Sequence, residues 1–400
     1  MFPMNSIYFS SIMTLPATCM LVACFLCILL LASIYFFRIR TVVRYRDKAD
    51  SERRDIADSD YLPASVVVYS QGNADMLGEL LKTLLDQNYP AAYEVIVVND
   101  GESADVRDTV SMLRATHSNL YLTFTPEGVV NLSRKKLALT LGVKAARYDV
   151  AVLTTPAAEI RSEHWLRRIM GNFDKEGKTE VVLGFAYIDP DEDEAFGKRR
   201  RAFDYVVESC RWLGVAIAGK PFRGTEYNIA YRKAAFMRNK GFAQTLNLHS
   251  GDDDIFISEI ARRNNTAVEL SEESIVRLRH GNYPRFFMER VLRRFFTERF
   301  IRRRPRLLIV LTVLLQLAAI ATGVAAGVLS APNMQPAVIA AVLVLFMFAL
   351  DIYVWRSAAR ALKSRMLFLT IPWLSVTYPF RHTLRRIRSR FGRLKKYTWD

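Results

Sequence analysis

The sequence predicts an α/β domain with one N-terminal and two C-terminal transmembrane helices and a further interfacial segment near the C-terminus. Three observations support this fold class. Apolar runs long enough to cross a bilayer lie near both ends of the 400-residue chain, alternating strand and helix patterns lie between them, and basic residues flank the runs. The hydrophobic fraction of 51% is above that of an ordinary soluble domain, and these runs account for the excess.

The first apolar run lies close to the N-terminus. Residues 1–37 contain no charged side chain, and 17–37 are long enough to cross a hydrocarbon core of about 30 Å at roughly 1.5 Å per residue. A signal peptide has a positive n-region and a small-residue cleavage site, and neither is clear here. We therefore expect a retained membrane helix.

Two further spans are predicted at 307–329 and 337–355, joined by a short uncharged link. Arginine and lysine are concentrated in the flanks of the three spans, at 38–54, 285–306 and 356–365. Because positive flanks stay in the cytoplasm, the sequence predicts a multi-pass protein of the cell membrane whose large domain is cytoplasmic.

A last apolar stretch at 366–380 is too short for a span and contains Pro372 and Pro379. A crossing would also place the basic tail, 381–400, on the wrong side of the membrane, so we expect an interfacial or re-entrant segment. The tail is then expected to lie on anionic lipid headgroups. Binding to anionic membrane lipids would explain much of the net charge of +16, and no nucleic acid partner is predicted.

The large domain opens with the clearest secondary-structure pattern in the chain. A buried strand is predicted at 65–69, an amphipathic helix at 74–87 and a second strand at 93–98. A right-handed crossover makes these strands parallel and brings the loops after them to one sheet edge. Ligands of nucleotide type bind at such an edge.

Short motifs follow the predicted elements: Val67-Val-Tyr69-Ser70, Gln87-Asn-Tyr-Pro90, Asn99-Asp100-Gly-Glu-Ser103, Ser133-Arg-Lys-Lys136, Gly224-Thr-Glu-Tyr-Asn228 and Gly251-Asp-Asp-Asp254. In these motifs the chain, over about 62–294, resembles family 2 of the inverting glycosyltransferases. That resemblance implies the nucleotide-sugar-binding, Rossmann-like GT-A fold.

The chain is then expected to divide into an N-terminal tail at 1–16, a transmembrane helix at 17–37, a basic juxtamembrane linker at 38–61, the GT-A domain at 62–284, a basic amphipathic interfacial helix at 285–306, transmembrane helices at 307–329 and 337–355, an interfacial or re-entrant segment at 366–380, and a basic cytoplasmic tail at 381–400.

The resemblance implies a donor pocket at the ends of the first two strands. Asp100 would hold the uracil or ribose of a nucleoside diphosphate sugar, and Tyr69 and Ser70 would shape the same pocket. The remaining donor-side residues would be Lys135 and Lys136, which neutralise the diphosphate, and Thr155. From the residues alone, a turn role before glycine is the alternative for Asp100, and two lysines at a helix start are more often simply solvated.

Three consecutive carboxylates, Asp252, Asp253 and Asp254, repel one another unless they are solvated, bind a cation, or include a base with raised proton affinity. A helix cap is the alternative, because a helical pattern begins directly after them. By the resemblance, Asp253 is the general base and its two neighbours orient the acceptor or raise the pKa of Asp253. The acceptor site would contain Gly224, Thr225, Glu226, Asn228 and Arg293.

The sequence departs from the family at the Asp-x-Asp that holds a divalent cation, because Thr155-Pro156-Ala157 stands there. A Mg2+ or Mn2+ cofactor is therefore not supported by the sequence, and no metal ligands are predicted. Three alternatives are open. Glu159 or the acidic loop 189–194 supplies displaced ligands, cationic side chains replace the metal, or the domain has lost catalysis and serves as a binding or scaffold subunit.

A second departure concerns the Gln-x-x-Arg-Trp of processive members, where this chain keeps only Arg293. The stretch around it favours an interfacial helix with phenylalanines in lipid and arginines at the headgroups. The function implied is a membrane-bound enzyme of cell-envelope polysaccharide biosynthesis. It would transfer a sugar from a UDP-sugar to a lipid-linked or glycan acceptor with inversion.

Overall fold

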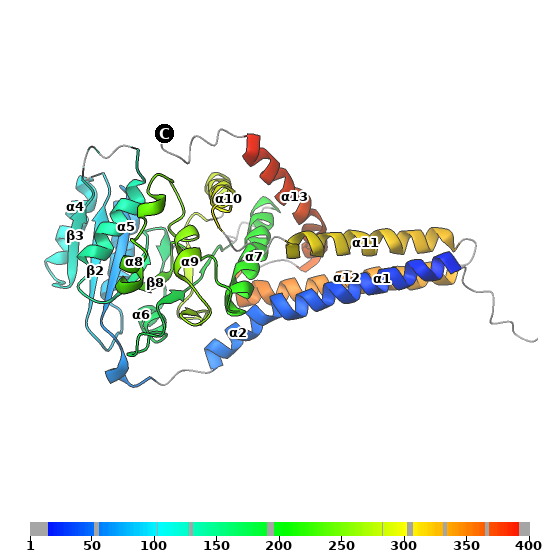
Figure 1. Ribbon diagram of the computed structural model, residues 1–400, viewed down its shortest axis with the longest axis horizontal. Coiled ribbons are helices and arrows are strands. Elements are labelled where there is room, and N and C mark those ends of the chain that lie inside the picture. Colours follow the sequence, from blue (N-terminus) through cyan, green and yellow to red (C-terminus); the bar gives the residue numbers. More distant parts are fainter. Residues whose placement is uncertain are drawn as a thin grey trace, which may run out of the picture.

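The computed structural model describes residues 15–51, 56–101, 103–126, 128, 131–189, 196–281, 283–301, 307–330, 334–364 and 368–391. The molecule is elongated, with the α/β domain at one end, three long helices at the other, and α7, α10 and α13 between them (Figure 1). Most of the expected N-terminal tail, nearly all of the acidic loop 189–194 and the end of the basic tail lie outside the described residues.

A seven-stranded sheet of order β3-β2-β1-β4-β8-β6-β9 forms the centre of the domain. Its strands are β1 (Ala64–Ser70), β2 (Tyr93–Asn99), β3 (Leu120–Phe124), β4 (Val150–Thr154), β6 (Val181–Leu183), β8 (Ile229–Arg232) and β9 (Thr266–Val268). All neighbours pair in parallel except β8, which is antiparallel to both β4 and β6. This arrangement confirms the predicted α/β class, and the parallel pairing of β1 with β2 confirms the predicted first unit.

The domain helices are α3 (Ala74–Leu85), α4 (Ala104–Arg114), α5 (Arg134–Ala145), α6 (Trp165–Met170), α7 (Phe196–Ile217), α8 (Lys233–Arg238), α9 (Ile255–Ile260) and α10 (Pro284–Thr297). Helix α5 lies unusually close to the sheet at Gly142. A Cβ at this position would lie 2.4 Å from Val67 Cγ1 and 2.9 Å from Val98 Cγ2. Glycine therefore lets α5 pack directly on β1 and β2, which brings the start of α5 to the carboxyl edge of the sheet.

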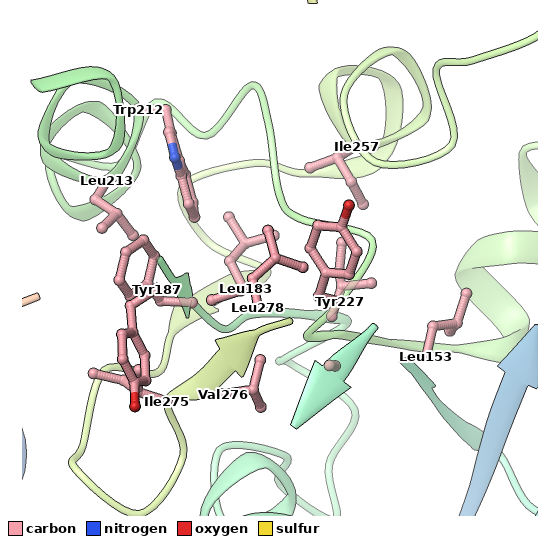
Figure 2. Packing of buried hydrophobic residues seen from close by; sticks show 14 of the residues in the cluster. Leu153, Leu183, Tyr187, Trp212, Leu213, Tyr227, Ile257, Ile275, Val276 and Leu278 are labelled. Carbon is pink, nitrogen blue, oxygen red and sulfur yellow. The ribbon is translucent and has the colours of Figure 1, made fainter. Parts of the chain in front are cut away.

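A small three-stranded sheet of order β5-β10-β7 completes the domain, with β5 at Ala158–Glu159, β7 at Ala186–Tyr187 and β10 at Val276–Leu278. Apolar side chains join it to the rest of the domain. Trp212 of α7, Leu183 of β6 and Leu278 of β10 belong to one buried cluster (Figure 2). Helix α7 is thereby fixed to the domain core along one side.

The other side of α7 packs on the long helices. Helix α1 (Leu15–Ile34) continues through a π-helical turn, Tyr35–Ile39, into α2 (Arg40–Ser51), so the expected linker from residue 38 begins as a helix. At Gly214 of α7, a Cβ would lie 2.9 Å from the Arg38 carbonyl oxygen, which shows how closely the two helices approach. Among the described residues, Leu15–Ser51 and Gln335–Ala361 are long and apolar enough to cross a membrane.

Helix α1 packs against α11 (Leu307–Leu329) and α12 (Met334–Ala361) along their lengths (Figure 1). Helix α13 (Ile371–Phe391) then runs without a break through the expected interfacial segment into the basic tail. Two of its arginines contact the domain, since Arg381 and Arg385 lie 2.5 and 2.7 Å from the carboxylate of Asp204 on α7. These arginines therefore bind protein, and the expectation that they lie on lipid headgroups is wrong.

The predicted interfacial helix also differs from the expectation. Helix α10 begins at Pro284 and ends at Thr297, and Phe287, Phe295 and Phe296 are buried within the protein. Burial against α7 and α13 takes the place of the expected insertion into lipid.

A polar cluster joins α13 to the three long helices. The carboxylate of Asp351 on α12 accepts hydrogen bonds from Tyr35 Oη (2.6 Å), Gln316 Nε2 (3.0 Å) and Ser375 Oγ (3.1 Å). Gln316 Nε2 also donates to Ser375 Oγ at 2.8 Å. All four side chains are buried. Because buried polar groups are costly when unpaired, this cluster fixes how α1, α11, α12 and α13 pack together.

Replacing Asp351 with alanine is expected to lower the thermal unfolding temperature of the detergent-purified protein by several degrees. The substitution removes the acceptor of three buried donors, and each unsatisfied donor costs about 1–3 kcal/mol. The matched control is Ser357→Ala on the same helix, because Ser357 is only partly buried and its hydroxyl donates within the helix to the Tyr353 carbonyl. Equal unfolding temperatures for the two variants would contradict a stabilising role for the cluster.

Candidate active site

The carboxyl ends of β1 and β2 enclose the side chain of Asp100. Its backbone N–H donates to the Ser70 carbonyl at 2.8 Å, which ties the two strand ends together. One carboxylate oxygen accepts from Tyr69 Oη at 2.8 Å, and the other accepts from Thr125 Oγ1 at 2.7 Å and Arg134 Nε at 2.8 Å. The expected donor residues Tyr69, Ser70 and Asp100 are thus brought together.

Sequence reasoning missed Thr125 and Arg134, which complete this site. Arg134 also donates to Thr125 Oγ1 at 3.1 Å, and its side chain is 31% exposed whereas that of Asp100 is fully buried. Arg134 is therefore the member of the group that faces solvent, with Asp100 orienting it. The sequence offered one signal for Arg134, which is its position directly before Lys135 and Lys136 at the start of α5.

The two lysines expected at the diphosphate point in different directions. Lys135 Nζ lies 2.7 Å from Asp252 and also pairs with Glu226. Lys136 is fully buried and donates to the Thr245 carbonyl at 2.7 Å and to Thr245 Oγ1 at 3.1 Å. Burial lowers the pKa of Lys136 to about 8, against the opposing effect of Asp252 and Asp254. Lys136 therefore supports the fold locally, and its expected place at the diphosphate does not fit the structure.

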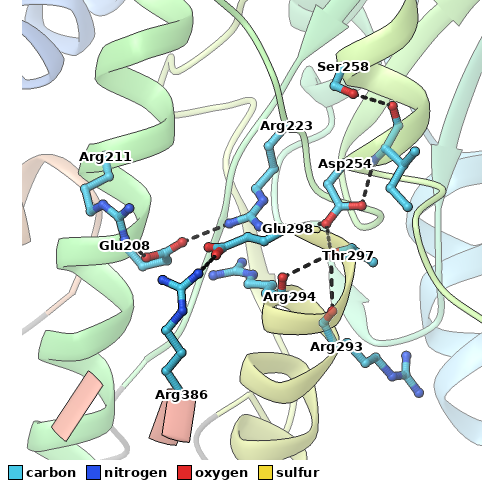
Figure 3. Close-up of polar contacts among 11 residues, drawn as sticks. Glu208, Arg211, Arg223, Asp254, Ser258, Arg293, Arg294, Thr297, Glu298 and Arg386 are labelled. Atoms are coloured by element: carbon cyan, nitrogen blue, oxygen red, sulfur yellow. Dashed lines mark hydrogen bonds and ion pairs between the residues drawn. The ribbon is translucent and has the colours of Figure 1, made fainter. Parts of the chain in front are cut away.

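The three consecutive aspartates have different surroundings. Burial would raise the pKa of Asp252, but the charge and hydrogen bond of Lys135 outweigh it and lower that pKa. Asp254 caps α9 by accepting from the Ile255 N–H at 2.7 Å, accepts from Thr297 of α10, and lies 3.7 Å from Arg223 Nη2 (Figure 3). The helix-cap alternative therefore holds for Asp254.

Asp253 differs from both neighbours. Among the described residues, no hydrogen bond or ion pair reaches its carboxylate, while its backbone carbonyl accepts from the Gly224 N–H at 2.7 Å. Burial, and then the charges of Asp254 and Asp252, raise the pKa of Asp253 to about 7. A carboxylate held in place by its backbone, unpaired and titrating near neutrality, is suited to accept a proton.

The loop 224–228 contains both packing and site residues. A Cβ at Gly224 would lie 2.6 Å from Ile229 Cδ1 and 3.5 Å from the Asp253 carbonyl oxygen, so a larger residue here would displace the Ile229 side chain beside the Asp253 backbone. Thr225 is buried and Glu226 reaches Lys135. Asn228 is fully buried, with Nδ2 donating to the Phe185 and Ser274 carbonyls at 3.1 and 2.8 Å. The expectation that Asn228 contacts an acceptor does not fit this placement.

The position of the missing Asp-x-Asp follows β4. Thr155 Oγ1 is buried and has no hydrogen-bond partner among the described residues. Glu159, the displaced ligand considered from sequence, pairs with Arg161 at 2.6 Å and Arg277 at 3.3 Å. No group of three or more His, Cys, Asp or Glu side chains in the described part of the chain is arranged to hold a metal ion. The residues present here therefore do not fit a divalent cation.

Arg293 lies on α10, four residues before the Thr297 that bonds to Asp254. Its guanidinium pairs with Glu289 at 2.6 Å, one turn earlier on the same helix, and is partly exposed. Arg293 also contributes, after burial, to lowering the pKa of His249 in the loop before the aspartates. The structure thus brings Arg293 to the side of the aspartate loop, 251–254.

Three solved structures align with this chain. The mannosyltransferase PcManGT from Pyrobaculum calidifontis, solved in complex with GDP-Man and Mn2+, aligns over 92% of this chain and 98% of its own, with 16% identity and a TM-score of 0.51. S. aureus TarS (1–349) aligns over 80% and 92% with 15% identity and a TM-score of 0.39. Glucosyl-3-phosphoglycerate synthase from Mycobacterium tuberculosis aligns over 59% and 73%, with 12% identity and a TM-score of 0.35.

A search of curated protein sequences finds no match. Residues 65–245 match the sequence profile described as Glycosyl transferase family 2, a range that includes the Asp100 site and the start of α5 and ends before Asp252. The alignment with the mannosyltransferase independently supports the GT-A fold. The chain therefore contains a Glycosyl transferase family 2 domain over residues 65–245.

Proposed function

We propose that the protein is a membrane-bound enzyme that transfers a sugar from a nucleotide-sugar donor to a lipid-linked or glycan acceptor, with inversion at the anomeric carbon. The observation that supports this most directly is the environment of Asp253. Of the three adjacent carboxylates, Asp252 and Asp254 are occupied by Lys135 and by Thr297 with Arg223, and Asp253 alone has no partner among the described residues. A free carboxylate beside two paired ones is the arrangement a general base needs.

In the proposed reaction, Asp253 removes the proton from an acceptor hydroxyl. The hydroxyl oxygen attacks the anomeric carbon of the donor sugar, the bond from that carbon to the diphosphate oxygen breaks, and the nucleoside diphosphate leaves with the electron pair. Attack opposite the leaving group inverts the anomeric configuration. Lys135 connects the loop 224–228 to the aspartate loop, 251–254, because its amine contacts both Glu226 and Asp252.

The donor is proposed to bind at the Asp100 site. Arg134, which Asp100 orients, is partly exposed there and offers guanidinium N–H groups to a phosphate or ribose. Fixed cationic groups of this kind stabilise charge on a leaving diphosphate. Since the residues at 155–157 do not fit a divalent cation, no step of the proposed reaction depends on one. A UDP-sugar is the donor that the sequence resemblance favours.

The placement in the membrane is also a proposal. Two described helices are long and apolar enough to span a bilayer, and the basic residues of α2 and α13 lie at the ends nearest the α/β domain. By the positive-inside rule the domain then faces the cytoplasm, where nucleotide-sugars are available.

Replacing Asp253 with asparagine is expected to lower kcat by about 10²- to 10⁴-fold, because the proton acceptor is lost while the side-chain volume is kept. Transfer from a UDP-sugar to a membrane-extract acceptor measures the effect. The control is Asp86→Asn, an exposed carboxylate at the end of α3. Full activity in the Asp253 variant would exclude it as the base.

The wild-type rate is also expected to depend on pH. A base acts in its deprotonated form, so kcat/KM is expected to rise as pH increases through about 7, the pKa of Asp253. The residual activity of the Asp253→Asn variant should lack this rise. Activity that falls across the same interval would contradict the assignment.

Replacing Asp100 with asparagine is expected to weaken UDP binding by about tenfold or more, since the ion pair that orients Arg134 is lost. Calorimetry on the detergent-purified protein, with Mg2+, with Mn2+ and with EDTA, measures the affinity. Asp105→Asn, an exposed carboxylate in the first turn of α4, is the matched control. Binding that disappears in EDTA would contradict donor binding through cationic side chains alone.

A further inference from the structure

Arg290 of α10 has no role in the site described above, yet its environment is unusual. The residue is 9% exposed, and none of its three guanidinium nitrogens has a hydrogen-bond partner among the described residues. Its guanidinium carbon lies 4.3 Å from the Tyr205 ring centroid and 5.5 Å from that of Phe287. Aromatic contacts compensate only part of the cost of burying a cation, so the guanidinium is available to an anion.

The acidic residues around Arg290 are already paired with other arginines. Among the described residues, neither Arg290 nor Arg294 one turn later forms an ion pair. Asp204 is paired with Arg381 and Arg385. Figure 3 shows the other pairs, which are Glu208 with Arg211 and Arg223, and Glu298 with Arg386. Burial lowers the pKa of Arg290 only to about 10, so it is charged at neutral pH. Two unpaired cations therefore lie side by side.

One cavity lies at these two arginines, and a second cavity shares a lining residue with it. The first, of about 30 Å³, is lined by Arg290, Arg294 and Tyr378 among others, and roughly 10–15 Å³ suffices for one water-sized group. The second, of about 90 Å³, lies where α7 and α13 meet the long helices. Tyr378 lines both cavities. The second is mainly apolar, and its lining includes Phe203, Val207, Val215, Trp355 and Pro379.

We propose that these cavities bind a lipid in which a phosphate joins a hydrocarbon chain to the acceptor sugar. The phosphate lies at Arg290 and Arg294, and the chain passes Tyr378 into the apolar cavity and on to the bilayer. Guanidinium groups match phosphate oxygens in geometry and charge, and an apolar cavity between membrane helices accepts hydrocarbon. The inference rests on the proposed transfer reaction and narrows its acceptor to a lipid-linked one.

The position of Arg290 on α10 agrees with this acceptor. Arg290 and Thr297 are seven residues apart and share one face of the helix, about 10 Å apart along its axis. Thr297 bonds to Asp254, the residue next to the proposed base. Burial raises the pKa of Tyr227 in the loop 224–228, and the charges of Arg290, which lowers this pKa, and of Asp253, which raises it, both act on the same ring. A phosphate at Arg290 would thus leave a sugar unit of the acceptor between it and Asp253.

The test is equilibrium binding of radiolabelled dodecyl phosphate to the full-length protein in phosphatidylcholine nanodiscs, corrected for uptake by empty nanodiscs. Dodecanol and inorganic phosphate serve as the comparison probes. We expect dodecyl phosphate to bind at least tenfold more tightly than either, and Arg290→Met to weaken it by about tenfold or more. Arg285→Met, an exposed arginine in the first turn of the same helix, should bind as the wild type does.

A second variant tests the chain-binding cavity independently. Val207→Phe fills the apolar cavity and is expected to weaken dodecyl phosphate binding while leaving inorganic phosphate binding unchanged. UDP binding and the unfolding temperature confirm that each variant is folded. Equal affinity for dodecyl phosphate in the wild type and Arg290→Met, or no preference over dodecanol, would overturn the inference.

The outcomes separate the acceptor site from the transfer reaction. If the wild type transfers sugar to a soluble glycan but does not bind dodecyl phosphate in preference to dodecanol, the lipid site is wrong and the proposed function stands. If dodecyl phosphate binds as expected but Asp253→Asn keeps full transfer activity, the site stands as a lipid-phosphate site and the proposed reaction is wrong.

Discussion

Repulsion among three adjacent carboxylates is the constraint around which the site is built. Two like charges 4 Å apart repel by about 4 kcal/mol at an effective dielectric constant of about 20. The structure relieves this repulsion unequally, since Lys135 binds Asp252, while the α9 N-terminus, Thr297 and Arg223 hold Asp254. Burial, and then the charges of Asp254 and Asp252, raise the pKa of the remaining carboxylate, Asp253, to about 7. Unequal pairing thus converts a repulsive sequence into one carboxylate that titrates near neutrality.

These partners come from distant parts of the chain, so the loop depends on how the domain meets the long helices. Arg223, fully buried, joins Asp254 to Glu208 of α7, and Thr297 joins Asp254 to α10 (Figure 3). Glu298, directly after Thr297, pairs with Arg386 of α13. A change in the packing of α7, α10 or α13 would therefore reach the aspartate loop through buried charged contacts, where a lost partner is costly.

Local pattern predicted the central part of the fold, because a parallel strand between two layers of helices has a continuous apolar sequence and amphipathic helices follow it. Spacing and resemblance likewise led to Asp100 and to the three aspartates. The same reasoning did not reveal Thr125 and Arg134, which meet Asp100 only through the fold. It also misplaced Lys136 and Asn228, because sequence gives the position of a residue at a helix start or loop but not the direction of its side chain. The different directions of Lys135 and Lys136 follow from their adjacent places on one helix, where successive side chains project about 100° apart.

The arginines of α10 and α13 show that sequence is equally unable to predict the partner of a charged side chain. Sequence assigns the arginines of α10 and α13 to lipid headgroups, which is the usual reason for basic residues beside apolar helices. In the structure, Arg381 and Arg385 pair with Asp204 of α7, and Arg386 pairs with Glu298 directly after α10, so these three bind protein carboxylates. Once those pairs are made, the unpaired Arg290 becomes distinctive, because a buried guanidinium surrounded by satisfied carboxylates has no internal partner left to bind. The buried charge of Arg290, which none of these ion pairs neutralises, therefore indicates a ligand.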